Sequence, residues 1–311
     1  QLIPYTMNGF PFGDFHQEIV KHSVYLPTWM EEARQEYTRT LIQLLDSILP
    51  SGADGSISTV PICWGQPVLR ADQWRRAADQ LRAVAATLKE LEDSTGRFIS
   101  LCIEPEPGCA IGTSVDMVEF FETYLLSSDE DVVRRYLRVC HDVCHANVMF
   151  EPQDEVLDRY AAHGLEIGKV QVSAAVVAPF DDVAEADRPA MLDQLSDFGE
   201  DRYLHQTCVR QDGEVHFYED LGLAIEAARR DGGARGEWRV HFHVPVYLES
   251  FGLLKTSQQD VLQCLARLPE KTHYEVETYA WNVLPTELQC KTLAEGIANE
   301  LKWFSAQRAS L

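Results

Sequence analysis

The sequence predicts an α/β protein in which short buried strands alternate with amphipathic helices. Apolar runs rich in β-branched residues recur along the chain, and segments with apolar residues at helical spacing lie between them. Hydrophobic residues make up 45% of the 311 residues, so the chain can bury a large core. The composition has no marked break along the chain, which predicts a single domain over residues 1–311.

Seven segments have the length and composition of strands, and eight segments between or after them have a helical period. This alternation is typical of parallel strands joined by crossover helices. The expected strands are 3–8, 56–61, 98–104, 137–143, 169–174, 239–244 and 274–278. The expected helices are 30–48, 71–91, 115–125, 131–137, 153–163, 221–229, 258–268 and 287–304.

The predicted arrangement of these strands is a TIM (β/α)8-type barrel. No helix or strand precedes the first predicted strand, so an eight-stranded barrel would begin upstream. We therefore expect a barrel that lacks one or two N-terminal βα units, or else a chain that closes with fewer strands. Residues 177–203 are the least regular part of the sequence, and we expect them to form a long loop over one mouth of the barrel.

The charge of the chain restricts its partners and compartment. A formal net charge of −22 opposes binding to nucleic acid or to anionic membranes, because both carry negative charge. The eight cysteines are scattered in apolar runs, which is typical of reduced core thiols. Cys140 and Cys144 lack the spacing of a zinc ribbon. No secretion signal opens the sequence, so we expect a cytoplasmic protein.

Acidic and imidazole side chains lie where several predicted strands end. Glu104 ends one apolar run, Asp142 and His145 follow the next, and Glu277 ends the last. The carboxyl ends of barrel strands meet at one face, so these groups are expected to converge. An isolated acid at a strand end more often anchors a loop, but several buried acids together repel one another unless a cation is present. The set therefore predicts a divalent metal site.

Two further features leave alternatives open. In His241-Phe242-His243 the two histidines alternate, so both imidazoles face the same side of a strand and either bind metal or satisfy core hydrogen bonds. His205 lies in the expected long loop and is either a lid residue or a solvated histidine. Glu104 is preferred to Glu106, because Glu106 lies between prolines that favour a turn.

Several motifs resemble the xylose-isomerase-like TIM-barrel superfamily and, more closely, the EboE-type metabolite-traffic proteins. The superfamily pattern is carried by Ile-Glu-Pro, Asp-x-x-His, Val-Gln-Val-Ser and Val-Glu-Thr-Tyr-Ala-Trp, each near a strand end. The closer resemblance spans essentially the whole chain and depends on three motifs: Met-Asn-Gly-Phe-Pro-Phe-Gly at 7–13, Gly-Ser-Ile-Ser-Thr-Val-Pro at 55–61, and Glu-Thr-Tyr-Ala-Trp-Asn-Val-Leu-Pro at 277–285.

The resemblance implies a ligand set of three carboxylates and one amide oxygen. The matching residues are Glu104, Asp142, Gln171 and Glu277, and such a set suits Mg²⁺ or Mn²⁺ better than Zn²⁺. His145 matches the substrate-facing histidine of the superfamily. This sequence departs from the pattern at His241 and His243, which lie on an apparent extra strand and are alternative metal ligands. The identity of the fourth metal ligand therefore stays open.

The resemblance also implies an isomerase or epimerase in a secondary-metabolite pathway that acts on a small polyol or keto sugar. Glu104 and Glu277 would transfer a proton next to a carbonyl, and His145 and His205 would orient substrate hydroxyls. One alternative is an endonuclease-IV-like phosphoester hydrolase with a second metal on the histidines, and another is a non-catalytic protein that binds a metabolite. The sequence has no Gly-rich phosphate loop, so it does not indicate a nucleotide cofactor. It leaves open whether the protein forms a homo-oligomer.

Overall fold

The computed structural model describes residues 3–279 and 281–311. Ala280, which lies in the last motif of the family resemblance, is outside the described residues. The chain forms two compact units, and each is described by itself. The first holds the residues up to 142 with 156–170 and 271–275, and the second holds 143–155, 171–270 and 276–311. The single domain expected from the sequence stays a prediction.

A six-stranded sheet forms the centre of the first unit. The strand order is β1-β2-β3-β4-β5-β12, and the ladders from β1 to β4 are parallel. Every residue of β2 and β3 is buried, as expected for parallel strands that are covered on both faces. The last residues of β5 and β12 are counted with the second unit. The bounds are β1 (Thr6–Asn8), β2 (Gly55–Thr59), β3 (Ile99–Ile103), β4 (Leu137–Asp142), β5 (Ile167–Val172) and β12 (His273–Val276).

Side-chain contacts join the two edges of this sheet. The Tyr5 hydroxyl donates to the backbone carbonyl of Tyr274 at 2.8 Å, and His273 Nδ1 lies 2.8 Å from Ser56 Oγ. Strand β12 at one edge therefore lies beside β1 and β2 at the other, and the sheet is nearly closed and barrel-like. The α/β class is confirmed. The eight-stranded barrel and its missing N-terminal units stay predictions, because this sheet has six strands among the described residues.

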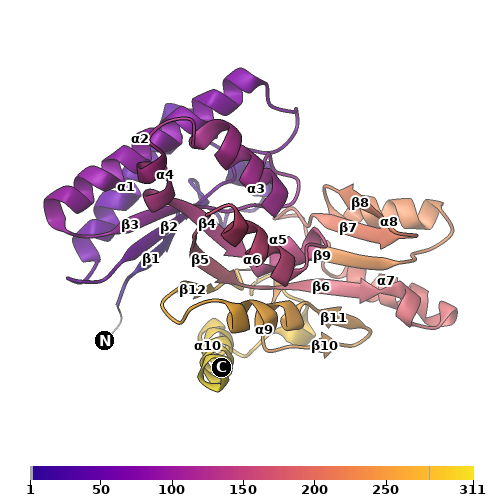
Figure 1. The fold of residues 1–311 in the computed structure, drawn as a ribbon. Coiled ribbons are helices and arrows are strands. Elements are labelled where there is room, and N and C mark those ends of the chain that lie inside the picture. Colours follow the sequence, from indigo (N-terminus) through magenta and orange to yellow (C-terminus); the bar gives the residue numbers. More distant parts are fainter. Residues whose placement is uncertain (1–2, 280) are drawn as a thin grey trace. The chain divides into compact units, whose positions relative to one another are not determined.

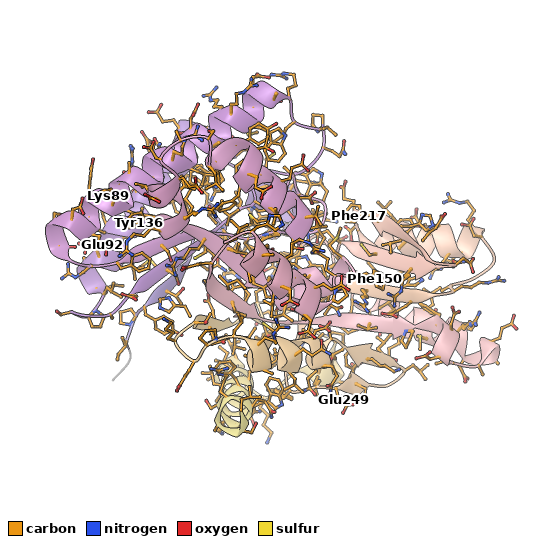
Figure 2. The ribbon with its side chains drawn as sticks, in the orientation of Figure 1. Lys89, Glu92, Tyr136, Phe150, Phe217 and Glu249 are labelled. Carbon is orange, nitrogen blue, oxygen red and sulfur yellow. The ribbon has the colours of Figure 1, made fainter. Side chains whose placement is uncertain are left out.

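Helices cover the sheet of the first unit, and α1, α2 and α4 pack side by side (Figure 1). In α1 the buried residues Thr38, Ile42 and Leu45 recur at spacings of four and three, which places them on one face. Glu92 of α2 accepts a hydrogen bond from the Tyr136 hydroxyl of α4 at 2.6 Å (Figure 2). Each of these helices overlaps a predicted one: α1 (Glu32–Ile48), α2 (Ala71–Thr95), α3 (Ser114–Phe120), α4 (Glu130–Tyr136) and α6 (Gln153–Ala162).

The second unit contains an antiparallel sheet that the sequence does not predict. The strand order is β10-β11-β6-β9-β7-β8. The β7–β8 hairpin turns at Asp212 and Gly213, whose φ angles of 52° and 85° suit a two-residue type I′ turn. The predicted strand 239–244 is confirmed within β9, but its expected place in the barrel was wrong. The bounds are β6 (Ala174–Pro179), β7 (Thr207–Gln211), β8 (Glu214–Tyr218), β9 (Glu237–Val244), β10 (Ser250–Phe251) and β11 (Leu254–Thr256).

The long loop expected at 177–203 was also wrong, because α7 lies within it. Pro189 in the first turn favours the start of this helix, and Met191 and Leu195 are buried. Nine residues contain too few turns for a clear helical period in the sequence. None of the helices in the described part of the chain is long and apolar enough to cross a membrane. The helices of this unit are α5 (Val143–Val148), α7 (Arg188–Ser196), α8 (Leu221–Arg230), α9 (Gln258–Arg267) and α10 (Leu293–Ser310).

Candidate metal centre

The first unit brings together two of the predicted carboxylate ligands. Glu104 directly follows β3, and Asp142 is the last residue of β4, the neighbouring parallel strand. Both side chains are 3% exposed, and a carboxylate oxygen of one lies within 4.8 Å of a carboxylate oxygen of the other. Two buried carboxylates at this separation repel each other unless a proton or a cation compensates their charge. This pair therefore fits one side of a divalent metal site.

Glu106 has a different environment in the same unit. Its carboxylate accepts a hydrogen bond of 2.7 Å from the Tyr25 hydroxyl, and the side chain is 5% exposed. The backbone N–H of Glu106 donates to the carbonyl of Ile111, which holds the turn that follows β3. These contacts tie Glu106 to the turn that follows β3, and the preference for Glu104 as the ligand stays a prediction.

Three of the predicted histidines meet in the second unit. His145 lies on α5, and His241 and His243 lie on β9. The Nε2 atoms of His145 and His241 are 3.2 Å apart, and the rings of His241 and His243 are 5.2 Å apart between centroids. The two β9 imidazoles share a face, as their alternation predicts, while Phe242 between them packs against Phe198. All three histidines are buried, so the cluster has little contact with solvent.

Hydrogen bonds fix the tautomers of the two β9 histidines. His241 Nδ1 lies 2.8 Å from the amide oxygen of Gln206, and His243 Nδ1 lies 2.6 Å from the backbone carbonyl of Glu277. Both oxygens are acceptors, so each ring carries its hydrogen on Nδ1 and its lone pair on Nε2. Burial, with help from His145, His243 and His205, lowers the pKa of His241 well below its ordinary value. Neutral imidazoles oriented in this way are typical of metal ligands.

His205 lies behind this cluster and is fully buried, so the interpretation as a solvated histidine was wrong. Its Nδ1 is 3.2 Å from the backbone carbonyl of His241, and its Nε2 is 3.0 Å from a carboxylate oxygen of Glu200. Burial by itself raises the pKa of Glu200, but hydrogen bonds from His205 and from two backbone N–H groups lower it overall. The pair therefore supports the strand that carries His241.

The remaining predicted ligands also lie in the second unit. Glu277 follows β12, and its carboxylate Oε2 is 3.8 Å from His243 Nδ1. Gln171 is fully buried, and neither atom of its side-chain amide has a hydrogen-bond partner among the residues that the structure describes. A buried amide of this kind is costly unless an ion or water satisfies it, which supports Gln171 as a ligand. The grouping of Gln171 and Glu277 with Glu104 and Asp142 stays a prediction.

The sequence did not identify three residues of the histidine cluster. The Tyr279 ring lies 4.7 Å from the His243 ring, and Gln206 fixes the His241 tautomer. The Sγ of Cys144 lies within 4.8 Å of a ring nitrogen of His241 and of one of His243. The adjacency of Cys144 to His145 was the available signal, but the absence of zinc-ribbon spacing led us to classify Cys144 as a core thiol.

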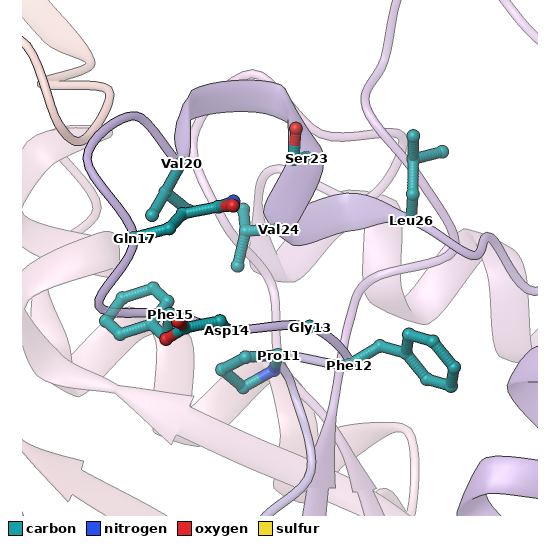
Figure 3. A pocket seen from close by; sticks show the side chains of 10 residues that line it. All are labelled: Pro11, Phe12, Gly13, Asp14, Phe15, Gln17, Val20, Ser23, Val24 and Leu26. Atoms are coloured by element: carbon teal, nitrogen blue, oxygen red, sulfur yellow. The ribbon is translucent and has the colours of Figure 1, made fainter.

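A cavity of about 190 Å³ lies in the first unit, lined by residues between 11 and 26 (Figure 3). Arg34 holds the backbone that leads into it, because its guanidinium donates to the carbonyls of Gly9 and Phe10 at 3.2 and 2.9 Å. Burial lowers the pKa of Arg34 to about 10, so the side chain stays charged at neutral pH. The lining is mostly apolar apart from Asp14, Gln17 and Ser23, and it holds none of the predicted metal ligands.

Comparison with known proteins adds little to this geometry. No family model matches the chain, and no curated protein matches it. The chain is similar to a solved structure of the IOLI protein with a bound zinc atom, at 15% sequence identity and a TM-score of 0.33. The match covers 55% of this chain and 52% of that one, so it spans about half the length of that structure. This similarity is too low to support a fold or a function, and the candidate site depends on its own geometry.

Proposed function

We propose that this chain is a metal-dependent isomerase or epimerase of the xylose-isomerase-like superfamily that acts on a small polyol or keto compound. The observation that carries the proposal is the buried cluster of His145, His241 and His243, in which acceptors on Nδ1 direct the lone pairs of His241 and His243 to Nε2. The motifs of the strand ends support the choice of superfamily.

The donor groups fit a divalent ion. In the first unit the Glu104 and Asp142 carboxylates offer oxygen. In the second unit His241 and His243 offer unprotonated nitrogen, and the buried amide of Gln171 offers oxygen. A bound divalent ion would polarise a carbonyl and hydroxyl pair of the substrate and so acidify the adjacent C–H group. Carboxylates favour Mg²⁺ or Mn²⁺, whereas imidazoles favour transition metals such as Mn²⁺, Fe²⁺ and Zn²⁺.

The chain's own carboxylates would move the proton. We assign the roles of acid and base to Glu104 and Glu277, as the family resemblance implies. Glu104 is buried beside Asp142, and a bound cation would keep both carboxylates ionised, so that Glu104 could accept a proton. The Glu277 backbone carbonyl accepts from His243, so the histidine that offers Nε2 also holds the base in place. His145 would orient a substrate hydroxyl, and His205 would position His241.

One observation favours a second candidate, the hydrolysis of a small phosphoester. The histidine cluster is rich in nitrogen donors, which suit metals that activate water. A second ion on the histidines beside one on the carboxylates would indicate this reaction. A protein that binds a metabolite without converting it is the outcome expected if the purified chain holds no metal.

Metal analysis of the purified protein tests the proposal first. We expect about one divalent ion per chain in the wild type and its loss in His241→Gln, because the variant removes one Nε2 ligand. His216→Gln, which changes an exposed histidine on β8, is the matched control and should keep the ion. Two or more ions per chain would favour hydrolysis, and no ion in the wild type would overturn the metal-dependent proposal.

Isotope exchange then tests the reaction. In D₂O, the wild type should wash deuterium into the position next to the carbonyl of at least one compound in a panel of ketoses and keto acids. Glu277→Gln should abolish this exchange, because the amide cannot take up the proton. If the metal-loaded wild type exchanges deuterium into no compound of the panel, the result would contradict isomerisation. It would not contradict the metal site.

A further inference from the structure

The second unit brings a thiol to the imidazole cluster. Cys144 and His145 are consecutive residues of α5, which begins directly after β4 and contacts β9. The Sγ of Cys144, a ring nitrogen of His241 and one of His243 all lie within 4.8 Å of one another. Cys144 and His243 are fully buried, and His241 is 6% exposed. Sulfur and nitrogen therefore converge in a site that solvent reaches poorly.

Local structure holds each of these atoms in place. The backbone N–H of Cys144 donates to Ser173 Oγ at 3.0 Å, which fixes the first turn of α5. The acceptors on His241 Nδ1 and His243 Nδ1 orient both rings with their lone pairs on Nε2. His145 Nε2 lies 3.2 Å from His241 Nε2. Two nitrogens so close either share a hydrogen or both face a cation.

We propose that Cys144, His241 and His243 bind one transition-metal ion of the zinc class through one thiolate sulfur and two imidazole nitrogens, with a fourth position left for substrate beside His145. The inference deepens the proposed function, because it names the ion at the histidine cluster and adds a ligand to it. Binding breaks the S–H bond of Cys144, forms the bond from sulfur to the metal and releases the proton to solvent. A tetrahedral set of nitrogen and sulfur donors selects Zn²⁺ over Mg²⁺ and Mn²⁺.

A second cysteine of the same core provides a matched control. Cys208 is fully buried in the hydrophobic cluster that also contains Cys144, together with Val148 and Ala175. Its Sγ lies 3.8 Å from the thioether sulfur of Met149, and burial raises its pKa to about 12. Cys208 thus shares the burial and packing of Cys144 and belongs to none of the candidate metal-binding groups among the described residues.

Cobalt substitution tests the assignment with Co²⁺ alone as the probe. Chelator-treated full-length protein is titrated with Co²⁺, and a near-ultraviolet charge-transfer band from thiolate to Co²⁺ is expected, with strong visible bands of a tetrahedral site. Cys144→Ser should lose the near-ultraviolet band, while Cys208→Ser should keep it. Thermal melting of each variant checks that it is folded. Visible bands without the near-ultraviolet band in the wild type would overturn the thiolate ligand and leave the metal-dependent proposal standing.

Proton release provides a measurement that needs no variant. An imidazole of ordinary pKa is mostly neutral at pH 7.5, so binding of Zn²⁺ to the chelator-treated wild type should release about one proton per ion, from the thiol. Release of no proton would contradict the inference even if Cys144→Ser failed to fold. A thiolate band together with proton release, but no deuterium exchange on any substrate, would support this site and contradict the proposed isomerase.

Discussion

At the scale of single residues, a buried lysine of the barrel-like sheet pairs with a partly exposed glutamate. Lys169 on β5 is fully buried, and its ammonium group pairs with Glu275 on β12 and lies 3.3 Å from the carbonyl oxygen of Met7. Burial by itself lowers the pKa of Lys169, but Glu275 and other acidic groups raise it to about 12. Lys169 therefore links β5 to both β12 and β1, which are the two edge strands of the sheet.

Loss of this ammonium group should destabilise the protein. We expect Lys169→Met to lower the free energy of unfolding by about 3 kcal/mol, the lower end for a broken buried pair because Glu275 is partly exposed. The double variant Lys169→Met with Glu275→Gln should recover part of this loss, since no charge is left unpaired. Lys255→Met, in an exposed pair with Asp182, should cost less than about 1 kcal/mol. Urea unfolding measures all three, and an equal cost for the single and double variants would contradict the argument.

His273, at the same edge of the sheet, should make stability depend on pH. Burial, with help from Lys169 and Arg138, lowers the pKa of His273. Below pH 6.5 the unfolded chain therefore takes up a proton that the folded chain does not, so stability falls as the pH decreases from 6.5 toward the folded pKa. His273→Gln should lose less stability than the wild type between pH 7.5 and 5.5 in urea unfolding. The exposed-site variant His216→Gln should follow the wild type, and a wild-type-like slope in His273→Gln would refute the assignment.

At the scale of elements, local chemistry determined where several helices begin. Thr113 caps α3: its hydroxyl accepts from the N–H of Asp116, and the Asp116 carboxylate accepts in return from the N–H of Thr113 at 2.9 Å. These contacts satisfy backbone donors that the first turn leaves without partners. Signals of this kind lie within four residues of one another, which is why the start of the helix predicted at 115–125 lies within one residue of the observed start of α3.

The cap of α3 can be tested directly. We expect Thr113→Ala to lower the free energy of unfolding by about 1 kcal/mol, because the N–H of Asp116 loses its acceptor. Thr113→Ser keeps the hydroxyl and should be close to the wild type. Urea unfolding of the two variants compares them, and a serine variant as unstable as the alanine variant would mean that the methyl group, and not the cap, stabilises this turn.

At the scale of the whole molecule, every strand predicted from an apolar run is present, but the sheets were not all predicted. Segment 239–244 was expected among barrel strands, and it instead pairs antiparallel with β6 and β7. An apolar run identifies a strand, whereas the partner and its direction depend on contacts with residues far along the chain. Strands β6, β7 and β8 were missed because the sequence in this region shows no clear alternation of strand and helix patterns.

The sequence by itself determined the features that depend on neighbouring residues. It placed His241 and His243 on one face, because side chains alternate along a strand, and it placed Glu104 and Asp142 at strand ends. Only the tertiary structure decided that Cys144 lies beside those histidines and that Tyr5 meets Tyr274 across the sheet edges. Such contacts join residues about 100 to 270 positions apart, and no local propensity or spacing specifies which distant surfaces pack together.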